Sequence, residues 1–294
     1  MSPPSPTSLR LTSVADGAEH LATIDGFGRE WTAFDQSALT DDHLRPIFDT
    51  YFAGFPWSSL PSGATGLDIG CGSGRWARFV APRVDRLTCV DASLQAVAVA
   101  RRALVDHANV DVRHGVAGAL PFGDHTFDFG YALGVLHHTP DPEAALRDCV
   151  RVLKPGAPLL VYLYYALENR SASYRLLWRA SDRARHLISA LPFRLRSWVS
   201  QTSAALLYWP LARTARLIGR FAPTLAEQVP LALYHDKPFY VMRNDALDRF
   251  GTRLEHRFSR DEIDAMLRRA GVDDVVFAER PPYWVAVGRA RSNV

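Results

Sequence analysis

The chain has 294 residues, of which 48% are hydrophobic and 22% charged, with a formal net charge of +3. These proportions are ordinary for a globular protein with a packed core. No apolar stretch approaches the roughly 20 residues that a membrane-spanning helix needs, since the longest, 204–212, is interrupted by Pro210. The three cysteines are too few and too scattered for a disulfide framework or a zinc site. They fit a reducing compartment, so we expect a cytoplasmic protein that binds no metal.

The N-terminal region is expected to divide in two. Residues 1–9 are rich in proline and serine without an apolar core, which is unlike a secretory signal peptide, and we predict that residues 1–26 are disordered. Residues 27–62 form a predicted cap with many aromatic side chains: Phe27, Trp31, Phe34, Phe48, Tyr51, Phe52, Phe55 and Trp57. These aromatics either pack on the next domain or contact a ligand, and packing is the more ordinary role.

Residues 63–165 alternate short apolar runs with helical stretches, the pattern of a mostly parallel sheet covered on both faces. The predicted strands are 65–69, 87–91, 110–114, 127–133 and 158–164, and the predicted helices are 75–80, 93–105 and 142–153. Asp141 stands at the N-cap of the last helix with Pro142 at its first position.

The alternation stops after residue 165. Residues 166–258 are predicted to be an insertion, helical to about 221 with breaks at Pro192 and Pro210. The pattern resumes in residues 259–294, where Ser259 and Glu262 form a capping box that opens a helix. Two further strands, 272–278 and 283–287, complete seven in all.

The strongest motif directly follows the first strand. Residues 67–74 read Leu-Asp-Ile-Gly-Cys-Gly-Ser-Gly, and glycines at such a turn let a ligand approach the backbone closely. Asp91 ends the second strand, 17 residues after Gly74, where an acid can accept hydrogen bonds from ribose hydroxyls. Residues 72–77 also fit the dinucleotide pattern G-x-G-x-x-A. An NAD(P)-dependent oxidoreductase is therefore one interpretation of these features.

Further motifs follow in a characteristic order: Leu-Pro-Phe at 120–122, Phe-Asp at 127–128, Gly-Val-Leu-His-His at 134–138 and Val-Leu-Lys-Pro-Gly at 152–156. Together with residues 68–74 they resemble class I S-adenosylmethionine (SAM)-dependent methyltransferases, in particular the branch with the ubiquinone- and menaquinone-biosynthesis enzymes. The resemblance covers about residues 63–162. It implies a Rossmann-like, doubly wound seven-stranded α/β sheet with an antiparallel last strand, and the conversion of SAM to S-adenosylhomocysteine.

The resemblance also implies roles for individual residues. Asp68 would lie near the SAM ammonium, which the carbonyl of Ala132 or Leu133 would also contact. The remaining implied cofactor residues are Gly70, Cys71, Gly72 and Gly74 for the methionine part, Asp91 for the ribose, and Ala92, Val116 and Ala117 for the adenine. Val116 stands where many members have an aspartate that receives the adenine amino group. This departure removes one hydrogen bond, worth about 1 kcal/mol.

His137 and His138 lie just after the fourth predicted strand. Methyl transfer to oxygen or nitrogen needs a base in many enzymes, and histidine suits that task near neutral pH. One of the pair is therefore a candidate catalytic base. The alternative is that both only shape the cofactor pocket, since members with different substrates carry histidine here.

The insertion is strongly basic. Residues 166–221 hold ten arginines and no lysine against Glu168 and Asp182, a net charge of +8. The arginines alternate with apolar residues, which fits a helical lid or homodimer element, or else a peripheral membrane contact. We do not expect nucleic-acid binding, because no motif for it is present.

Residues 234–245 are dense in polar and aromatic groups, as binding loops are. We predict that Lys237, Tyr240 and Arg243 face the methyl acceptor together with Tyr164 or Tyr165. The alternative is that these charges hold a lid closed through salt bridges to acidic neighbours.

The sequence thus predicts a methyltransferase with a small-molecule acceptor, most simply an oxygen. Three alternatives remain open at this point. They are methylation of carbon or nitrogen on a quinone- or lipid-like acceptor at a membrane surface, a non-catalytic SAM-binding partner protein, and the oxidoreductase.

Overall fold

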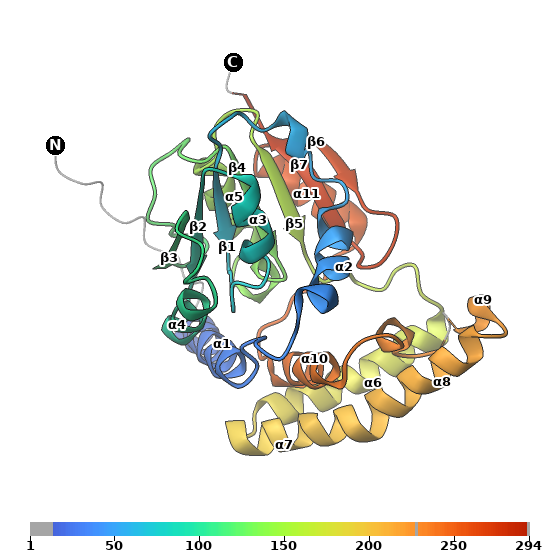
Figure 1. Cartoon of the computed structure of the whole chain (residues 1–294). Coiled ribbons are helices and arrows are strands. Elements are labelled where there is room, and N and C mark those ends of the chain that lie inside the picture. Colours follow the sequence, from blue (N-terminus) through green and yellow to red (C-terminus); the bar gives the residue numbers. More distant parts are fainter. Residues whose placement is uncertain (1–13, 227–228, 293–294) are drawn as a thin grey trace. The chain divides into compact units, whose positions relative to one another are not determined.

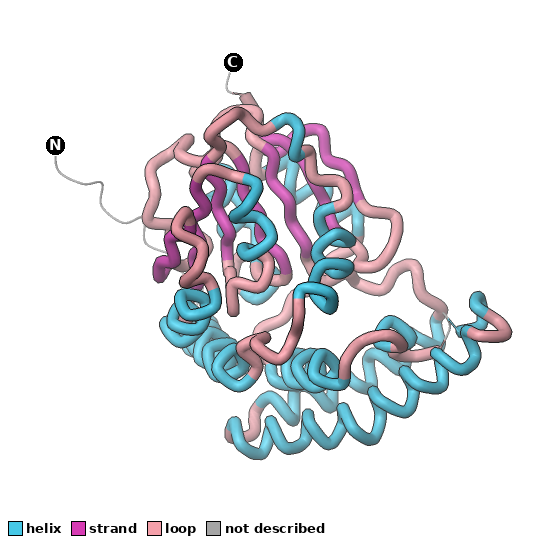
Figure 2. The backbone as a smooth tube through the Cα atoms, in the orientation of Figure 1, coloured by secondary structure: helices cyan, strands magenta, loops and turns pink. Residues whose placement is uncertain are grey.

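A computed structural model describes residues 14–226 and 229–292, and these form two compact units (Figure 1). Unit 1 comprises the residues up to 37, residues 44–169 and those from 254 onward. Unit 2 comprises residues 38–43 and 170–253. All the strands belong to unit 1, whereas unit 2 is built from helices and loops (Figure 2).

Unit 1 is organised around one seven-stranded sheet in the order β3-β2-β1-β4-β5-β7-β6. The strands are β1 (Thr65–Ile69), β2 (Arg86–Asp91), β3 (Val110–His114), β4 (Phe129–Leu133), β5 (Pro158–Tyr162), β6 (Val272–Phe277) and β7 (Val285–Ala290). Strands β1 to β5 pair in parallel, and β7 is antiparallel to both β5 and β6. The predicted doubly wound α/β sheet with an antiparallel last strand is confirmed.

The helices of this part of the chain cover both faces of the sheet (Figure 1). They are α1 (Val14–Ala33), α2 (Asp41–Phe52), α3 (Ala77–Val80), α4 (Leu94–Ala103), α5 (Pro142–Arg151) and α11 (Arg260–Arg269), with short turns η1 (Trp57–Ser59), η2 (Ala81–Arg83) and η3 (Leu136–His138). Two helix starts follow the predicted caps. Asp141 accepts the Ala144 N–H at 2.9 Å, and Ser259 and Glu262 form the reciprocal capping box.

The prediction of disorder for residues 1–26 is wrong for residues 14–26, which belong to helix α1; residues 1–13 lie outside the described part of the chain. Composition suggested a solvated segment, but tertiary contacts stabilise the helix. Thr23 and Glu30 are buried, and α1 packs on the start of α4 so closely that a Cβ on Gly28 would lie 2.3 Å from the Ser93 hydroxyl.

The aromatic residues at the end of α2 and between α2 and β1 pack against the sheet. Phe52 meets Tyr131 edge-on with ring centroids 5.3 Å apart, and Phe55 meets Phe129 at 5.7 Å. A Cβ on Gly66 would collide with the Phe129 ring, so glycine in β1 provides the space for this layer. These side chains form core.

Unit 2 contains α6 (Ala172–Ser189), α7 (Phe193–Ser203), the π-helical turn η4 (Ala204–Tyr208), α8 (Trp209–Gly219), α9 (Pro223–Ala226), η5 (Ala232–Tyr234) and α10 (Phe239–Gly251). Its own small core joins η4 and α8 to α10 through Ala204, Tyr208, Ala212, Met242 and Ala246. The expected binding loop 234–245 is therefore helical from residue 239. Apolar side chains at 242, 246 and 247 are buried on one face, which favours a helix there. None of the helices described is both long and apolar enough to cross a bilayer.

Candidate active site

The loop after β1 turns sharply because its glycines, Gly70 and Gly72 among them, adopt conformations that other residues rarely take. Gly70 has φ +71° and Gly72 has φ +55°. The Gly70 N–H donates to the Val90 carbonyl at 2.8 Å, which ties the loop to β2. A Cβ on Gly72 would lie 2.7 Å from the Trp31 indole, so α1 rests directly on this glycine.

Asp91, at the end of β2, organises the same edge of the sheet. Its two carboxylate oxygens accept the Gly72 N–H at 2.9 Å and the Ser93 N–H at 2.8 Å. Burial raises the pKa of Asp91, while these two N–H groups and the charge of His114 oppose the rise. Each carboxylate oxygen still has a lone pair available for a ligand hydroxyl.

Asp68 lies inside β1 and is almost fully buried. Burial raises its pKa to about 8; the nearby Tyr131 hydroxyl and Arg75 oppose the rise, and the Asp91 charge adds to it. Among the described residues, no hydrogen-bond donor satisfies its Oδ2 atom. A buried carboxyl without a partner is costly unless a cation or donor arrives from outside.

The other residues with implied cofactor roles lie along the same carboxyl edge of the sheet. The Gly115 N–H donates to the Asp91 carbonyl, which brings the turn of Val116 and Ala117 beside the end of β2. Ala132 and Leu133 end β4, the neighbour of β1. Cys71 is buried in the glycine loop, and its thiol pKa is raised well above the usual value by the neighbouring Cys89 and by burial. A raised pKa opposes a nucleophilic role.

One face of α1 covers this site; the sequence placed Phe27 and Trp31 in the aromatic cap but did not predict this helix. Thr23, Phe27 and Trp31 recur at steps of four residues, and each contacts a different part of the site. Trp31 rests on Gly72, and the Phe27 ring lies 4.9 Å from the His138 ring. The Thr23 hydroxyl accepts the Leu254 N–H at 3.3 Å. The periodicity was visible in the sequence, but apolar and polar residues are only weakly separated on the two sides of this helix, which hid it.

His138 is held in a defined orientation. Its Nδ1–H donates to the Leu254 carbonyl at 2.8 Å, since a carbonyl can only accept. The neutral ring therefore carries its lone pair on Nε2. Phe27 and Tyr164 flank the ring, the latter edge-on at 5.5 Å.

His137 has different surroundings. It is fully buried, and neither of its ring nitrogens has a hydrogen-bond partner among the described residues. Its ring lies 3.9 Å from that of Tyr164 at 30°. Burial, together with the charges of His138, Arg257 and His256, lowers its pKa well below the usual value. The ring therefore stays neutral at physiological pH.

The segment Leu254–Phe258 connects these parts, and no sequence motif pointed to it. Besides its bonds through Leu254, it donates the His256 N–H to the His137 carbonyl and the Phe258 N–H to the Tyr164 carbonyl, both at 2.9 Å. Within this segment, Glu255 and Arg257 form an ion pair of 2.8 Å, and the Glu255 side chain is almost inaccessible to solvent. Both histidines and the end of β5 are thereby held by a strap that returns from unit 2.

Comparison with known proteins agrees with this geometry. A family model described as a methyltransferase domain matches residues 67–161. A ubiquinone biosynthesis O-methyltransferase from Xanthomonas oryzae pv. oryzae (strain PXO99A) is 31% identical over 229 residues, covering 71% of this chain and 93% of the relative.

The chain belongs to the class I SAM-dependent methyltransferases.

A demethylmenaquinone methyltransferase from Bacillus licheniformis is also 31% identical, over 105 residues that cover 35% of this chain and 45% of the relative. A solved SAM-dependent methyltransferase from Methanosarcina mazei superposes with a TM-score of 0.47 and 18% identity, covering 84% of this chain and 98% of that one. Family membership decides against the oxidoreductase and the non-catalytic binding protein as alternatives.

The residues of the methyltransferase fit the cofactor that its family uses. Asp68 offers a buried, unsatisfied carboxyl oxygen for a cationic ammonium, and Asp91 offers lone pairs for ribose hydroxyls. The turn between them is made by Gly70 and Gly72 at positive φ, and Trp31 of α1 covers it at Gly72. No three histidine, cysteine, aspartate or glutamate side chains in the described ranges form a metal-binding group.

The remaining predicted acceptor residues of the methyltransferase belong to both units. In unit 1, the Tyr164 ring contacts both histidine rings, and the Tyr165 ring lies 5.6 Å from that of Tyr283. In unit 2, Lys237 forms an ion pair with Asp236 at 3.4 Å. Tyr240 and Arg243 lie on α10, and the Arg243 guanidinium donates to Gln201. A role for Lys237, Tyr240 and Arg243 at the acceptor stays a prediction.

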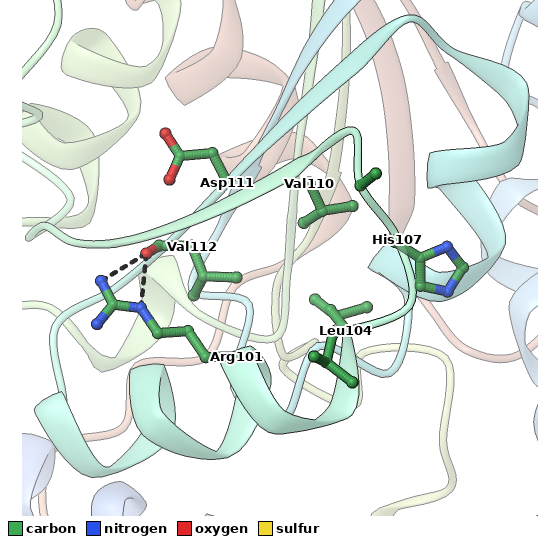
Figure 3. Close-up of a pocket in the computed structure, with 8 residues that line it drawn as sticks. Arg101, Leu104, His107, Val110, Asp111 and Val112 are labelled. Carbon is green, nitrogen blue, oxygen red and sulfur yellow. Dashed lines mark hydrogen bonds between the residues drawn. The ribbon is translucent and has the colours of Figure 1, made fainter.

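A surface pocket of the methyltransferase lies away from the carboxyl edge of the sheet. It lies between α4 and the start of β3 and is lined by Leu104, His107 and Asp111 among others (Figure 3). The Arg101 guanidinium on its wall is committed to the Val112 carbonyl, at 3.1 and 2.8 Å. Ligands in open α/β sheets bind at the carboxyl ends of the strands, and this pocket faces the opposite edge.

Proposed function

We propose that this methyltransferase methylates a hydroxyl oxygen of a small quinone-like acceptor and that His138 is the catalytic base. The observation that carries the proposal is the hydrogen bond from His138 Nδ1 to the Leu254 carbonyl, because it leaves Nε2 as the proton acceptor. The name of the Xanthomonas relative, a ubiquinone biosynthesis O-methyltransferase, supports both the oxygen and the acceptor class.

The cofactor supplies an electrophilic methyl carbon on a sulfonium. His138 Nε2 would accept the proton of the acceptor hydroxyl as its oxygen displaces the sulfur, which would leave with the electron pair of the carbon–sulfur bond. The Leu254 carbonyl stabilises the resulting imidazolium through Nδ1. The protein's main contributions are orientation and exclusion of water, and α1 contributes to both through Phe27 and Trp31.

His137 is the less suitable base. Its charged form is disfavoured by burial and by neighbouring positive charge, and no described group would accept its second N–H. We therefore assign it a positioning role, in which its ring holds Tyr164 beside the acceptor. For the cofactor, we assign Asp68 to the ammonium and Asp91 to the ribose.

The test uses SAM with an isotopically labelled methyl group and a matched pair of polyprenylated catechols, one free and one with its hydroxyls already methylated. Labelled methoxy product from the free catechol alone supports oxygen transfer. Label on ring carbon, or product from both substrates, overturns it.

The role of the base is tested with His138→Ala. We expect kcat to fall about 100- to 10,000-fold while SAM affinity stays normal. With a nitrocatechol, whose hydroxyl is already ionised, the loss should shrink because no base is required. His137→Ala is the matched comparison, and its deficit should be the same for both acceptors. A His138→Ala enzyme with full turnover, or an equal deficit on both acceptors, refutes the assignment.

A further inference from the structure

Unit 2 carries an unusual outer surface. Helices α7, η4 and α8 run on without interruption from 193 to 219, about 40 Å at 1.5 Å per residue (Figure 1). One stripe of this long helix faces inward, and its buried positions are 196, 200, 204, 208, 212 and 215. The π turn contributes to this regularity, because it lets the buried positions recur at steps of four or three residues throughout.

The other side of the helix exposes large apolar side chains. They are Leu195, Trp198, Leu206, Leu207, Trp209 and Leu217, followed by Phe221 just beyond the helix, and their exposed fractions run from 47% to 84%. We call these seven residues the outer face. Isolated exposed apolar residues are normal, but a stripe with two tryptophans along one helix is typical of an interaction surface.

The helices of this part of unit 2 are rich in positive charge. Residues 172–220 contain nine arginines, no lysine and a single acidic residue, Asp182. Two of these arginines are internal: Arg185 donates to the Thr252 carbonyl and Arg196 to the Gly251 carbonyl, both at 2.8 Å. Asp182 is committed to Arg185 at 2.8 Å and to Arg249 at 3.5 Å. Of the other seven arginines, three lie on α6 and four lie on or at the end of the long helix that carries the outer face, and no carboxylate on these helices is left to neutralise them.

Exposed apolar side chains next to unneutralised arginines favour one kind of partner over another. A second copy of the chain would bring one arginine-rich face against another, because a two-fold interface is self-complementary. An anionic bilayer instead offers negative headgroups to the arginines and acyl chains to the apolar stripe, and tryptophan is enriched at that boundary.

We propose that the outer face of unit 2 docks the enzyme peripherally on membranes that contain anionic phospholipids. The helix would lie in the plane of the surface, with Trp198, Leu206 and Trp209 inserted below the headgroups and arginines such as Arg194 and Arg220 among the phosphates. This inference does not depend on the identity of the acceptor or on the catalytic base.

The test measures binding of the full-length protein to vesicles by flotation. One set contains phosphatidylcholine alone, and in the other about a third of the lipid is phosphatidylglycerol. We expect at least tenfold tighter binding to the anionic set, weakened by salt, with a blue shift of tryptophan fluorescence. The double variant Trp198→Ser/Leu206→Ser should lose most of the binding. Arg194→Gln/Arg220→Gln should lower affinity about 25-fold on the anionic set only.

A matched control pair, Val276→Ser and Arg86→Gln, changes an exposed apolar residue and an exposed arginine of unit 1 and should bind as the wild type does. All variants should keep their helical content and their turnover on a water-soluble acceptor.

Equal binding to both vesicle types, or no binding at low salt, overturns the proposal. A dimer in sedimentation velocity that Trp198→Ser dissociates would assign the face to a second copy instead. If the wild-type protein binds anionic vesicles but methylates no catechol, the proposed function is contradicted and membrane docking is still supported.

Discussion

Asp68 gives a prediction that depends on the tertiary structure. Its carboxyl is buried, has a pKa of about 8, and leaves Oδ2 without a described partner. A cationic ammonium that binds beside it favours the ionised form, so SAM binding should drive a proton off the protein. Replacing Asp68 with asparagine keeps the shape of the side chain and removes the proton.

The expected number of released protons and the pH dependence of SAM binding follow from the pKa of Asp68. At pH 6.5 a carboxyl with a pKa of about 8 is protonated in nearly every unliganded molecule, so each SAM bound should release about one proton. The apparent Kd for SAM should then fall almost tenfold per pH unit between about pH 5.5 and 7.5, about 70-fold in total. Above that range the amine of SAM itself begins to titrate.

Calorimetry in buffers of different ionisation enthalpy counts the released protons directly. The Asp68→Asn variant should release almost none and should bind SAM weakly with little dependence on pH. Asp91→Asn is the matched control, because this residue should meet neutral hydroxyls: its affinity should fall while proton release persists. If the wild-type protein releases no proton and its affinity is flat from pH 5.5 to 7.5, Asp68 does not contact the ammonium.

The same carboxyl should affect stability in the absence of ligand. Its folded-state pKa lies above the value of an unfolded aspartate, so between about pH 4 and pH 8 the folded protein holds a proton that the unfolded chain has released. The free energy of unfolding should therefore fall as pH rises through this window, by up to about 1.4 kcal/mol per pH unit from this group. Urea titrations should show a shallower slope for Asp68→Asn, and an unchanged slope would contradict the assigned pKa.

Three further substitutions test the packing of the site. Gly72→Ala places a Cβ at positive φ against Trp31 and should cost about 2 kcal/mol in urea unfolding; adding Trp31→Ala should recover part of this loss, and strict additivity would refute the contact. Glu255→Gln leaves Arg257 without its buried counter-charge and should lower stability by about 3 kcal/mol, whereas a change below 1 kcal/mol would show that the pair is solvated. Ser259→Ala removes the capping box of α11 and should cost about 1 kcal/mol by the same assay; no loss would mean that solvent replaces the cap.

Much of the fold follows from local patterns in the sequence. The alternation of apolar strands and helices between 65 and 162 favours a parallel sheet covered by helices, as observed. Strong local signals such as the caps at Asp141 and Ser259 fixed the helix starts. Weak local signals failed, because helix α1 and helix α10 owe their stability to the faces that they bury.

The sequence by itself determined the family, the sheet and the positions of Asp68, Asp91 and the glycine turn, because those depend on spacing along one βαβ region. Only the tertiary structure distinguished His138 from its neighbour. That distinction rests on a carbonyl at Leu254, 116 residues further along the chain, and no local pattern encodes so distant a partner. The contact of α1 with Gly72 likewise joins two distant segments, and no local pattern encodes it. Contacts between distant segments decide which tautomer, which pKa and which exposed face a residue has, and so they decide its chemistry.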